Sequence, residues 1–199
     1  MRISIRREPL TTIIRWSRRT LFGGGLAVLA YCGWVVIDAW QYQRAEAIAF
    51  DTPPVVAMPV SVRRTPEVFA DGLIGRLEIP RLELTAMVME GTGRTTLRRA
   101  AGHIPGTALP GQTGNVGISA HRDTFFRPLR KIKLGDSLEM ATRNGAYRYR
   151  VVSTRIVRPS DVSVLAAGDS EAVTLVTCYP FYFVGPAPFR FIVRAERVQ

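Results

Sequence analysis

The chain has 199 residues, a formal net charge of +11, and only two cysteines and two histidines. This length holds a membrane segment and one domain of about 130 to 140 residues, which can bury its own core, but not two folded domains. Two cysteines exclude a disulfide framework. No basic helix, zinc-ligand spacing or ribonucleoprotein motif accompanies the charge, so nucleic acid is not an expected partner. The positive charge either attracts anionic polymers and lipid headgroups or has no binding role. The second interpretation is that it reflects a general bias of composition, because nearly all of the charge is arginine scattered along the chain.

An uncharged stretch of seventeen residues, Leu21 to Ile37, follows an arginine-rich start of the chain. At ~1.5 Å per residue a helix of this length is about 25 Å long, the short end of what crosses a bilayer. Arginines before such a helix keep the N-terminus in the cytoplasm. We therefore expect a basic cytoplasmic segment at 1–20, a transmembrane anchor at 21–40, an extended linker at 41–70 and an exported domain at 71–199.

Two other interpretations of this end remain open. Ala47-Ile48-Ala49 is similar to a signal-peptidase cleavage site, although the polar residues before it disfavour cleavage. Ser17-Arg18-Arg19-Thr20-Leu21-Phe22 is similar to a twin-arginine export signal. Under each interpretation the domain is exported.

Short strand patterns separated by turn residues begin near Gly72. Tyr147, Tyr149 and Val151 alternate with arginines, a period of two that is typical of a strand with one buried face. Strands are predicted at 73–79, 82–89, 115–120, 137–141, 147–157, 172–178 and 189–197. Short helices are predicted at 95–101, 124–132 and 160–167. Seven or so short strands with few helices predict an all-β domain that forms a small closed barrel.

A thiol, an imidazole and a guanidinium each lie at the edge of a predicted strand. Cys178 ends one strand, His121 follows another, and Arg190 lies at the start of the last. These groups are the parts of nucleophilic acyl transfer: an attacker, a proton carrier and a stabiliser of developing negative charge. Each also has a structural alternative, since a lone cysteine is often a small buried hydrophobe and an arginine can simply face water from an amphipathic strand.

Three further residues are candidates for the surroundings of this site. Asp123, two residues after His121, is placed to orient the imidazole. Thr177 precedes the cysteine and either shapes the pocket or is an ordinary β-branched strand residue. His103 lies between glycine and proline residues that predict a loop, where it lines a groove or, as we favour, packs structurally.

No metal or cofactor is expected. Cys178, His121 and His103 lack the spacing of zinc ligands. The acidic residues near the predicted barrel loops, such as Asp136 and Asp169, do not cluster in the sequence as calcium ligands would.

Five motifs occur in a fixed order between residues 75 and 198: Gly102-His103-Ile104-Pro105-Gly106-Thr107, Gly114-Asn115-Val116, Ala120-His121-Arg122-Asp123-Thr124-Phe125-Phe126, Thr174-Leu175-Val176-Thr177-Cys178-Tyr179-Pro180, and Arg190. In sequence and order they resemble the sortases, the membrane-anchored cysteine transpeptidases of bacterial surfaces. The details are most similar to class D sortases and their relatives in Gram-negative bacteria.

The resemblance implies an eight-stranded closed barrel with histidine after the fourth strand, cysteine at the end of the seventh and arginine on the eighth. It implies that Cys178 cleaves a C-terminal Leu-Pro-x-Thr-Gly-like sorting signal between Thr and Gly, that His121 protonates the leaving amine, and that Arg190 stabilises the oxyanion or holds the substrate backbone. The acyl group then passes to an amine of a peptidoglycan precursor or a pilin-like lysine. It also implies a single-pass protein of the bacterial plasma (inner) membrane, with its catalytic domain outside the cytoplasm.

Two other functions use the same residues. In a cysteine hydrolase, water resolves the thioester, and dependence of the product on an acceptor amine distinguishes the two reactions. In a catalytically silent peptide-binding barrel, Cys178 is inert. A wall-linking L,D-transpeptidase is a poor fit because it places its histidine and cysteine nearly side by side, whereas 57 positions separate His121 from Cys178.

Overall fold

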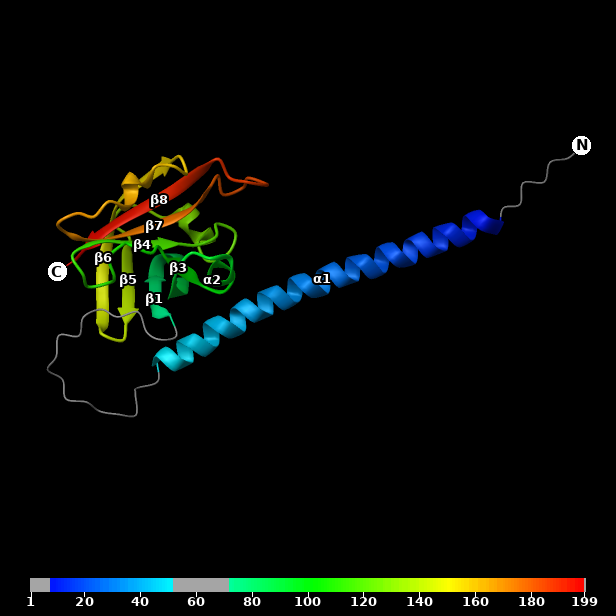
Figure 1. Ribbon diagram of the computed structural model, residues 1–199, viewed down its shortest axis with the longest axis horizontal. Helices are drawn as coiled ribbons and strands as arrows, with labels where there is room; N and C mark the ends of the chain where they lie inside the picture. The colour runs from blue at the N-terminus through cyan, green and yellow to red at the C-terminus, as the bar shows by residue number, and fades with distance from the viewer. Residues whose placement is uncertain (1–7, 52–71, 199) are drawn as a thin grey trace, which may run out of the picture. The chain divides into compact units, whose positions relative to one another are not determined.

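The computed structural model describes residues 8–51 and 72–198 (Figure 1). Residues up to Gln41 form one unit and residues from Tyr42 onward form a second. A single helix, α1, runs over Glu8–Asp51. Its part from Thr12 to Ile48 has a mean hydropathy of 1.8 in its most apolar window and is long and apolar enough to cross a membrane. Residues 41 to 51, expected to be extended, are therefore helical, while the rest of the expected linker, 52–70, lies outside the described residues.

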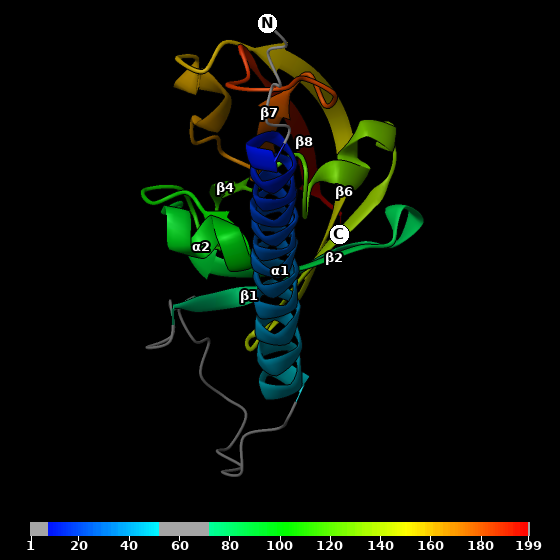
Figure 2. The same cartoon turned by 90° about the vertical axis from the view of Figure 1, so that its right-hand side faces the viewer.

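Eight strands form a closed barrel (Figure 1). They are β1 (Leu73–Ile79), β2 (Leu84–Glu90), β3 (Ala101–His103), β4 (Gly114–Ser119), β5 (Ser137–Thr142), β6 (Gly145–Val157), β7 (Glu171–Tyr179) and β8 (Phe189–Arg197). Around the barrel they follow the order β1-β2-β3-β4-β7-β8-β6-β5. The pairs β2–β3 and β4–β7 are parallel and the others antiparallel. In both views β7 and β8 lie side by side (Figure 2). The predicted all-β barrel is confirmed.

The expected strands are present, together with one more, β3. It was not predicted because it has only three residues and contains Gly102, which leaves no alternation to detect. The strand predicted at 82–89 begins at Leu84 because Pro80–Leu82 forms a short 3-10 turn, η1.

The short helices are also smaller than predicted. One is α2 (Arg94–Arg99), and two are 3-10 turns, η2 (Arg127–Lys131) and η3 (Val162–Leu165). Asp161, expected at the start of the last of these, caps it by accepting a hydrogen bond from the amide of Ser163 at 3.2 Å.

All eight strands contribute side chains to the core that fills the barrel. On β4 the inward residues include Val116 and Ile118, and on β7 they are Val173 and Leu175. Because side chains alternate along a strand, the residues between them lie on the outer face. This alternation decides which residues near the ends of β4 and β7 are available for chemistry.

Candidate active site

The register of two neighbouring strands brings His121 and Cys178 to one end of the barrel. β4 and β7 run parallel, with Ser119 paired to Val176. The pairing continues beyond β4, because the amide of Ala120 donates to the carbonyl of Val176 at 3.3 Å. His121 and Cys178 each lie two residues past the Ser119–Val176 pair, on backbones whose strands are about 4.8 Å apart. Residues 57 positions apart in the chain are thus brought to the same end of two neighbouring strands.

Cys178 lies on the outer face of β7. The preceding inward residues are Val173 and Leu175, so the alternation turns Cys178 away from the core. It is a half-buried free thiol. A side chain in this position is accessible from outside the barrel and still supported by the sheet on both sides.

Arg190 lies directly opposite Cys178 on the antiparallel pair β7–β8. Directly opposed residues share one face of a sheet, so the guanidinium and the thiol emerge on the same side. Nη1 of Arg190 donates to the carbonyls of Phe189 at 3.0 Å and Ala187 at 3.3 Å. These two bonds hold the stem of Arg190 against its own loop beside the thiol.

His121 begins the turn that follows β4. Its carbonyl accepts hydrogen bonds from the amides of Thr124 at 3.4 Å and Phe126 at 3.2 Å. The side chain of His121 is exposed, whereas Phe126 is completely buried and anchors the turn in the core. The turn therefore presents the imidazole to the outside while its base stays fixed.

Asp123 is turned toward a different neighbour from the expected one. Its carboxylate, 71% exposed, accepts from Nε of Arg122 at 3.4 Å. Within the part of the chain that the structure describes, it makes no hydrogen bond to His121. Orientation of the imidazole by Asp123 stays a prediction without a contact to support it.

Thr177 lies on the core side of β7 and is buried, so it does not share a face with Cys178. Its Oγ1 donates to the carbonyl of Ala120 at 2.8 Å. The bond joins the residue before the candidate nucleophile to the residue before His121. Thr177 therefore contributes to the site by fixing two strands rather than by lining it.

His103 is on strand β3, not on the predicted loop, and only 3% of its surface is exposed. Nδ1 lies 2.8 Å from Oε2 of Glu90, and Nε2 lies 2.9 Å from Oγ1 of Thr107 and 3.0 Å from the carbonyl of Ala108. These contacts tie β2 and β3 to the connection that precedes β4. They favour the structural interpretation of His103.

The outer face of β4 and β7 is covered at the end away from Cys178. Nδ2 of Asn115 donates to the carbonyl of Val164 in η3 at 3.1 Å, and Oδ1 accepts from Thr174 at 2.8 Å. A Cβ on Gly117 would lie 3.1 Å from Leu165 and 3.2 Å from Cβ of Ile104. Two connections, β3–β4 and β6–β7, therefore pack on this face, and a side chain at 117 would push their residues back by a few tenths of an ångström.

Asn115 and Thr174 are parts of the sequence motifs, but the sequence assigns neither a role of its own. A polar residue inside an apolar strand sequence indicates that its side chain makes a buried hydrogen bond, but the sequence does not show with which group. Arg122 is a second case, because the sequence placed it beside His121 with no function, whereas the structure buries it.

The acidic residues are distributed away from a common centre. Asp136 pairs with Arg81, whose hydrogen bond lowers the pKa of that carboxyl below its ordinary value. Glu90 contacts His103. Among the residues at 8–51 and 72–198, no three His, Cys, Asp or Glu side chains gather as a metal site would require.

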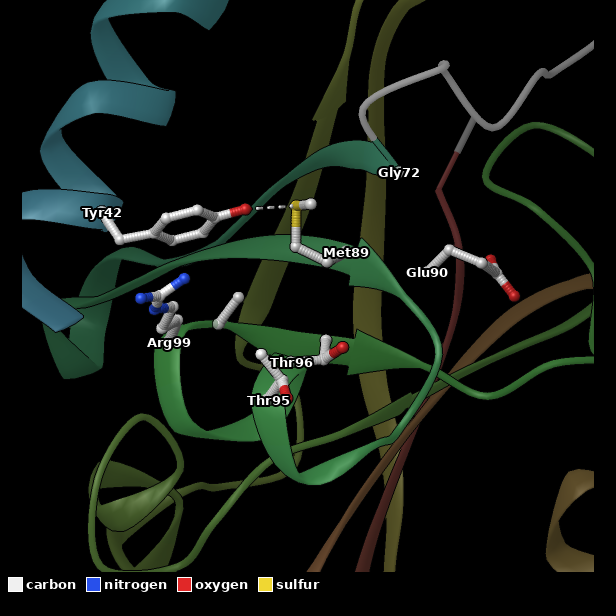
Figure 3. Close-up of a pocket in the computed structure, with 8 residues that line it drawn as sticks. Tyr42, Gly72, Met89, Glu90, Thr95, Thr96 and Arg99 are labelled. Carbon is white, nitrogen blue, oxygen red and sulfur yellow. Dashed lines mark hydrogen bonds between the residues drawn. The ribbon is translucent and has the colours of Figure 1, made fainter. Parts of the chain in front are cut away.

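A pocket lies beside β2 and α2 (Figure 3). In the figure the hydroxyl of Tyr42 points to the sulfur of Met89, with which it makes a 3.4 Å hydrogen bond. The residues that line the pocket are Tyr42, Gly72, Met89, Glu90, Thr95, Thr96, Arg99 and Ala100. The predicted catalytic residues do not contribute to it, so this pocket is separate from the candidate active site.

Comparison with known proteins identifies this barrel. A family model for the sortase domain matches residues 77–198. Sortase D of Bacillus subtilis (strain 168) is 37% identical over 125 residues, which cover 62% of this chain and 63% of the relative. The chain thus spans about three fifths of the length of that relative.

Solved structures agree. The Sortase D5 transpeptidase of Clostridium perfringens is 28% identical, with a TM-score of 0.59 over 64% of this chain and 79% of that one. A sortase C of Clostridium perfringens, solved with the C-terminal cell wall sorting motif, is 29% identical, with a TM-score of 0.60 over 66% of this chain and 74% of that one. The matched region contains all eight strands except the first residues of β1. The chain belongs to the sortase family.

Proposed function

We propose that this protein is a membrane-anchored transpeptidase, which cleaves a Leu-Pro-x-Thr-Gly-like sorting signal between Thr and Gly and joins the acyl group to an amine. The observation that carries the proposal is the position of His121 and Cys178, each two residues past the Ser119–Val176 pair of neighbouring parallel strands, with Arg190 directly opposite the cysteine on the same face. A nucleophile, a proton carrier and a cation then surround one reacting carbonyl.

In the first half-reaction, the Cys178 thiolate attacks the carbonyl carbon of the signal's threonine. The carbon–nitrogen bond to glycine breaks, His121 gives its proton to the leaving amine, and a thioester remains on Cys178. Arg190 stabilises the oxyanion from the neighbouring strand, or holds the substrate backbone with its fork of donors. In the structure the Arg190 guanidinium donates to main-chain carbonyls of its own loop. In the proposed reaction it exchanges these hydrogen bonds for bonds to the substrate.

In the second half-reaction, the acceptor amine attacks the thioester carbonyl and passes its proton to the neutral imidazole of His121. The carbon–sulfur bond breaks, which regenerates the thiolate and the imidazolium. In this proposal the signal approaches Cys178 along the outer face of β4 and β7, beside the β3–β4 and β6–β7 connections. A peptidoglycan precursor or a pilin-like lysine supplies the amine.

The helix α1 supplies the anchor in this proposal. Leu21, Phe22 and Leu29 are at least 70% exposed, and a lipid environment would cover them. The arginines that precede the stretch favour a cytoplasmic N-terminus, which leaves the barrel on the outer side of the bacterial plasma membrane. Carbonate extraction of membranes, followed by protease treatment of spheroplasts, tests both the anchoring and the orientation.

The test of activity uses the full-length chain in detergent micelles with Leu-Pro-x-Thr-Gly peptides, with and without triglycine, and mass spectrometry of the products. We expect a peptide joined to triglycine, together with an acyl-enzyme mass on Cys178. The Cys178→Ala variant controls for contaminating peptidases. Hydrolysis that triglycine does not divert supports the cysteine hydrolase instead, and a wild-type protein that forms neither product nor thioester across varied signals contradicts both enzymatic functions.

A further inference from the structure

Arg122, the residue after His121, is an arginine with only 7% of its surface exposed. Nη1 donates to the carbonyl of Pro180 at 2.8 Å, and Nη2 donates to the carbonyls of Phe183 and, at 3.3 Å, Gly185. The guanidinium therefore binds three main-chain acceptors of one segment, Pro180–Gly185, which opens the connection between β7 and β8.

A buried guanidinium is unfavourable unless its donors are satisfied, and here carbonyl groups satisfy most of them. The acidic partner of Arg122, Asp123, is itself 71% exposed, so it compensates the buried charge weakly. Three diverging acceptors match the planar fork of arginine, whereas the single ammonium of lysine cannot reach them all in the same way. This environment is built for an arginine.

The segment that Arg122 holds has few other anchors on its outer side. Tyr182 is 79% exposed and Val184 is 95% exposed. The inner side of the connection carries Phe181, which contacts the ring of Phe191 at a centroid distance of 5.3 Å. Phe181 also contacts the ring of Tyr179 at a centroid distance of 6.0 Å, so the segment is fixed on its inner side by these aromatic contacts and by the guanidinium, and Arg130 contacts Tyr182 on its exposed side.

The clamp also continues a series of contacts between the histidine strand and the cysteine strand. Ala120 donates to Val176 and Thr177 donates to Ala120. The third contact, from Arg122 to Pro180, lies beyond the end of the sheet, one residue after His121 and two residues after Cys178. Past the last ladder bond, Arg122 joins these two segments from a buried position directly beside the candidate catalytic pair, whereas the Arg130–Tyr182 contact joins them at the exposed surface.

We propose that Arg122 is a positioning residue of the transfer reaction, which holds the His121 turn against the Pro180–Gly185 segment and so sets the approach of His121 to Cys178. The proposal rests on the proposed function. Arg122 does not touch the substrate. Its loss therefore lowers kcat and leaves KM nearly unchanged, because a displacement of about 1 Å between reacting groups can cost on the order of 100-fold in rate.

The test compares full-length Arg122→Lys and Arg122→Gln with wild type in detergent. Lysine keeps the positive charge and the aliphatic chain but loses the planar guanidinium. Glutamine keeps an amide NH2 group on a shorter chain and loses the charge. The two variants therefore distinguish the effect of the charge from that of the guanidinium geometry. The matched control is Arg130→Lys, because Arg130 also contacts this connection, through the Tyr182 hydroxyl at 3.0 Å, but from the exposed side. Thermal unfolding of each variant comes first, and all rates are expressed per folded molecule.

We expect both Arg122 variants to lose about 10- to 100-fold in kcat, with KM within about threefold of wild type, and Arg130→Lys to match wild type. Alkylation of Cys178 by iodoacetamide needs no sorting signal, and we expect it to slow in the Arg122 variants. Chymotrypsin cleavage after Tyr182 or Phe183 is expected to become faster.

The positioning role is overturned if both Arg122 variants keep the wild-type kcat and alkylation rate, even if their melting temperatures fall, because such a result describes a purely structural arginine. A KM effect without a kcat effect also overturns it and assigns the segment to substrate binding. If wild type turns over no peptide, the proposed function fails, while alkylation and proteolysis still decide the role of Arg122.

Discussion

Cys178 and Arg190 form a directly opposed pair on β7 and β8, with both side chains on the outer face of the barrel. The two residues face each other across neighbouring hydrogen-bonded strands, so their backbone positions stay in register as long as β7 and β8 stay paired. The guanidinium is held by carbonyls of Ala187 and Phe189 and can turn on this fixed base toward a substrate.

The first prediction concerns the chemistry of Arg190. Arg190→Lys keeps a positive charge but loses the planar fork, so kcat/KM is expected to fall by about 100- to 1,000-fold, the loss typical of removing one oxyanion donor. Steady-state kinetics with a sorting-signal peptide measure this fall. Arg194→Lys on the same strand is the control, with an expected loss of less than about threefold. Equal activity of the two variants would show that Arg190 is structural.

The second prediction concerns the bond from Thr177 to Ala120. Thr177→Val keeps the shape but leaves the Ala120 carbonyl without this donor in a buried place, which costs about 1 to 3 kcal/mol of folding free energy. Because the bond fixes the start of the His121 turn, kcat is expected to fall by about tenfold as well. Thr177→Ser retains the hydroxyl and is expected to keep most of the folding free energy and most of the wild-type kcat.

The measurements are denaturant unfolding and peptide turnover on the same preparations. A valine variant with reduced stability and an unchanged kcat would mean that the position of His121 does not depend on this bond. A serine variant as poor as valine would assign the effect to the lost methyl group instead.

The barrel strands were predictable because their patterns are local: β6 alternates with a period of two, and β4 and β7 are short apolar runs between turns. Strand β3 has only three residues and no such pattern, although it pairs with its neighbours in the sequence, β2 and β4. The parallel pairing of β4 with β7 is equally invisible to local patterns, so the common location of His121 and Cys178 came from the resemblance to sortases.

The surroundings of the site were less predictable, because side-chain direction depends on the turn. Spacing alone suggested that Asp123 faces the imidazole, yet its carboxylate contacts Arg122. Arg122 itself gave no sign of burial, since arginine is rarely buried and its partners are main-chain carbonyls without a sequence signature. His103 was expected on a loop because glycine and proline flank it, and β3 was too short to be detected.

The third prediction concerns the covered face of β4. A side chain at Gly117 meets Leu165 and Thr107, each 3.1 Å from its Cβ, so Gly117→Val must push both covering connections outward. We expect KM for the sorting-signal peptide to rise several-fold, because the proposed approach of the signal runs beside these connections, while kcat changes little. Gly168→Ala in the β6–β7 connection, where an added Cβ meets nothing within 4 Å, is the control. An unchanged KM in the valine variant would place the substrate elsewhere.

The fourth prediction is a pH dependence of stability that originates at Asp136, a residue that is 8% exposed. Its carboxylate accepts from Nε and, at 2.6 Å, Nη2 of Arg81, and from the amide of Lys133 at 2.8 Å. The Arg81 hydrogen bond is the largest cause that lowers the pKa of Asp136 below its ordinary value of 3.8. The unfolded chain therefore binds this proton more readily than the folded protein does.

Stability from such a group is fully present above the ordinary pKa and is lost as the pH falls through the lowered pKa of the folded protein. Asp136→Asn removes the titrating group, so its melting temperature is expected to lie several degrees below that of wild type at pH 7. The gap is expected to narrow steadily as the pH falls from about 4 to 2. The exposed Asp169→Asn variant, measured over the same pH range, controls for general loss of negative charge. A gap between Asp136→Asn and wild type that does not change with pH would show that the Arg81 contact does not depend on the charge of the carboxylate.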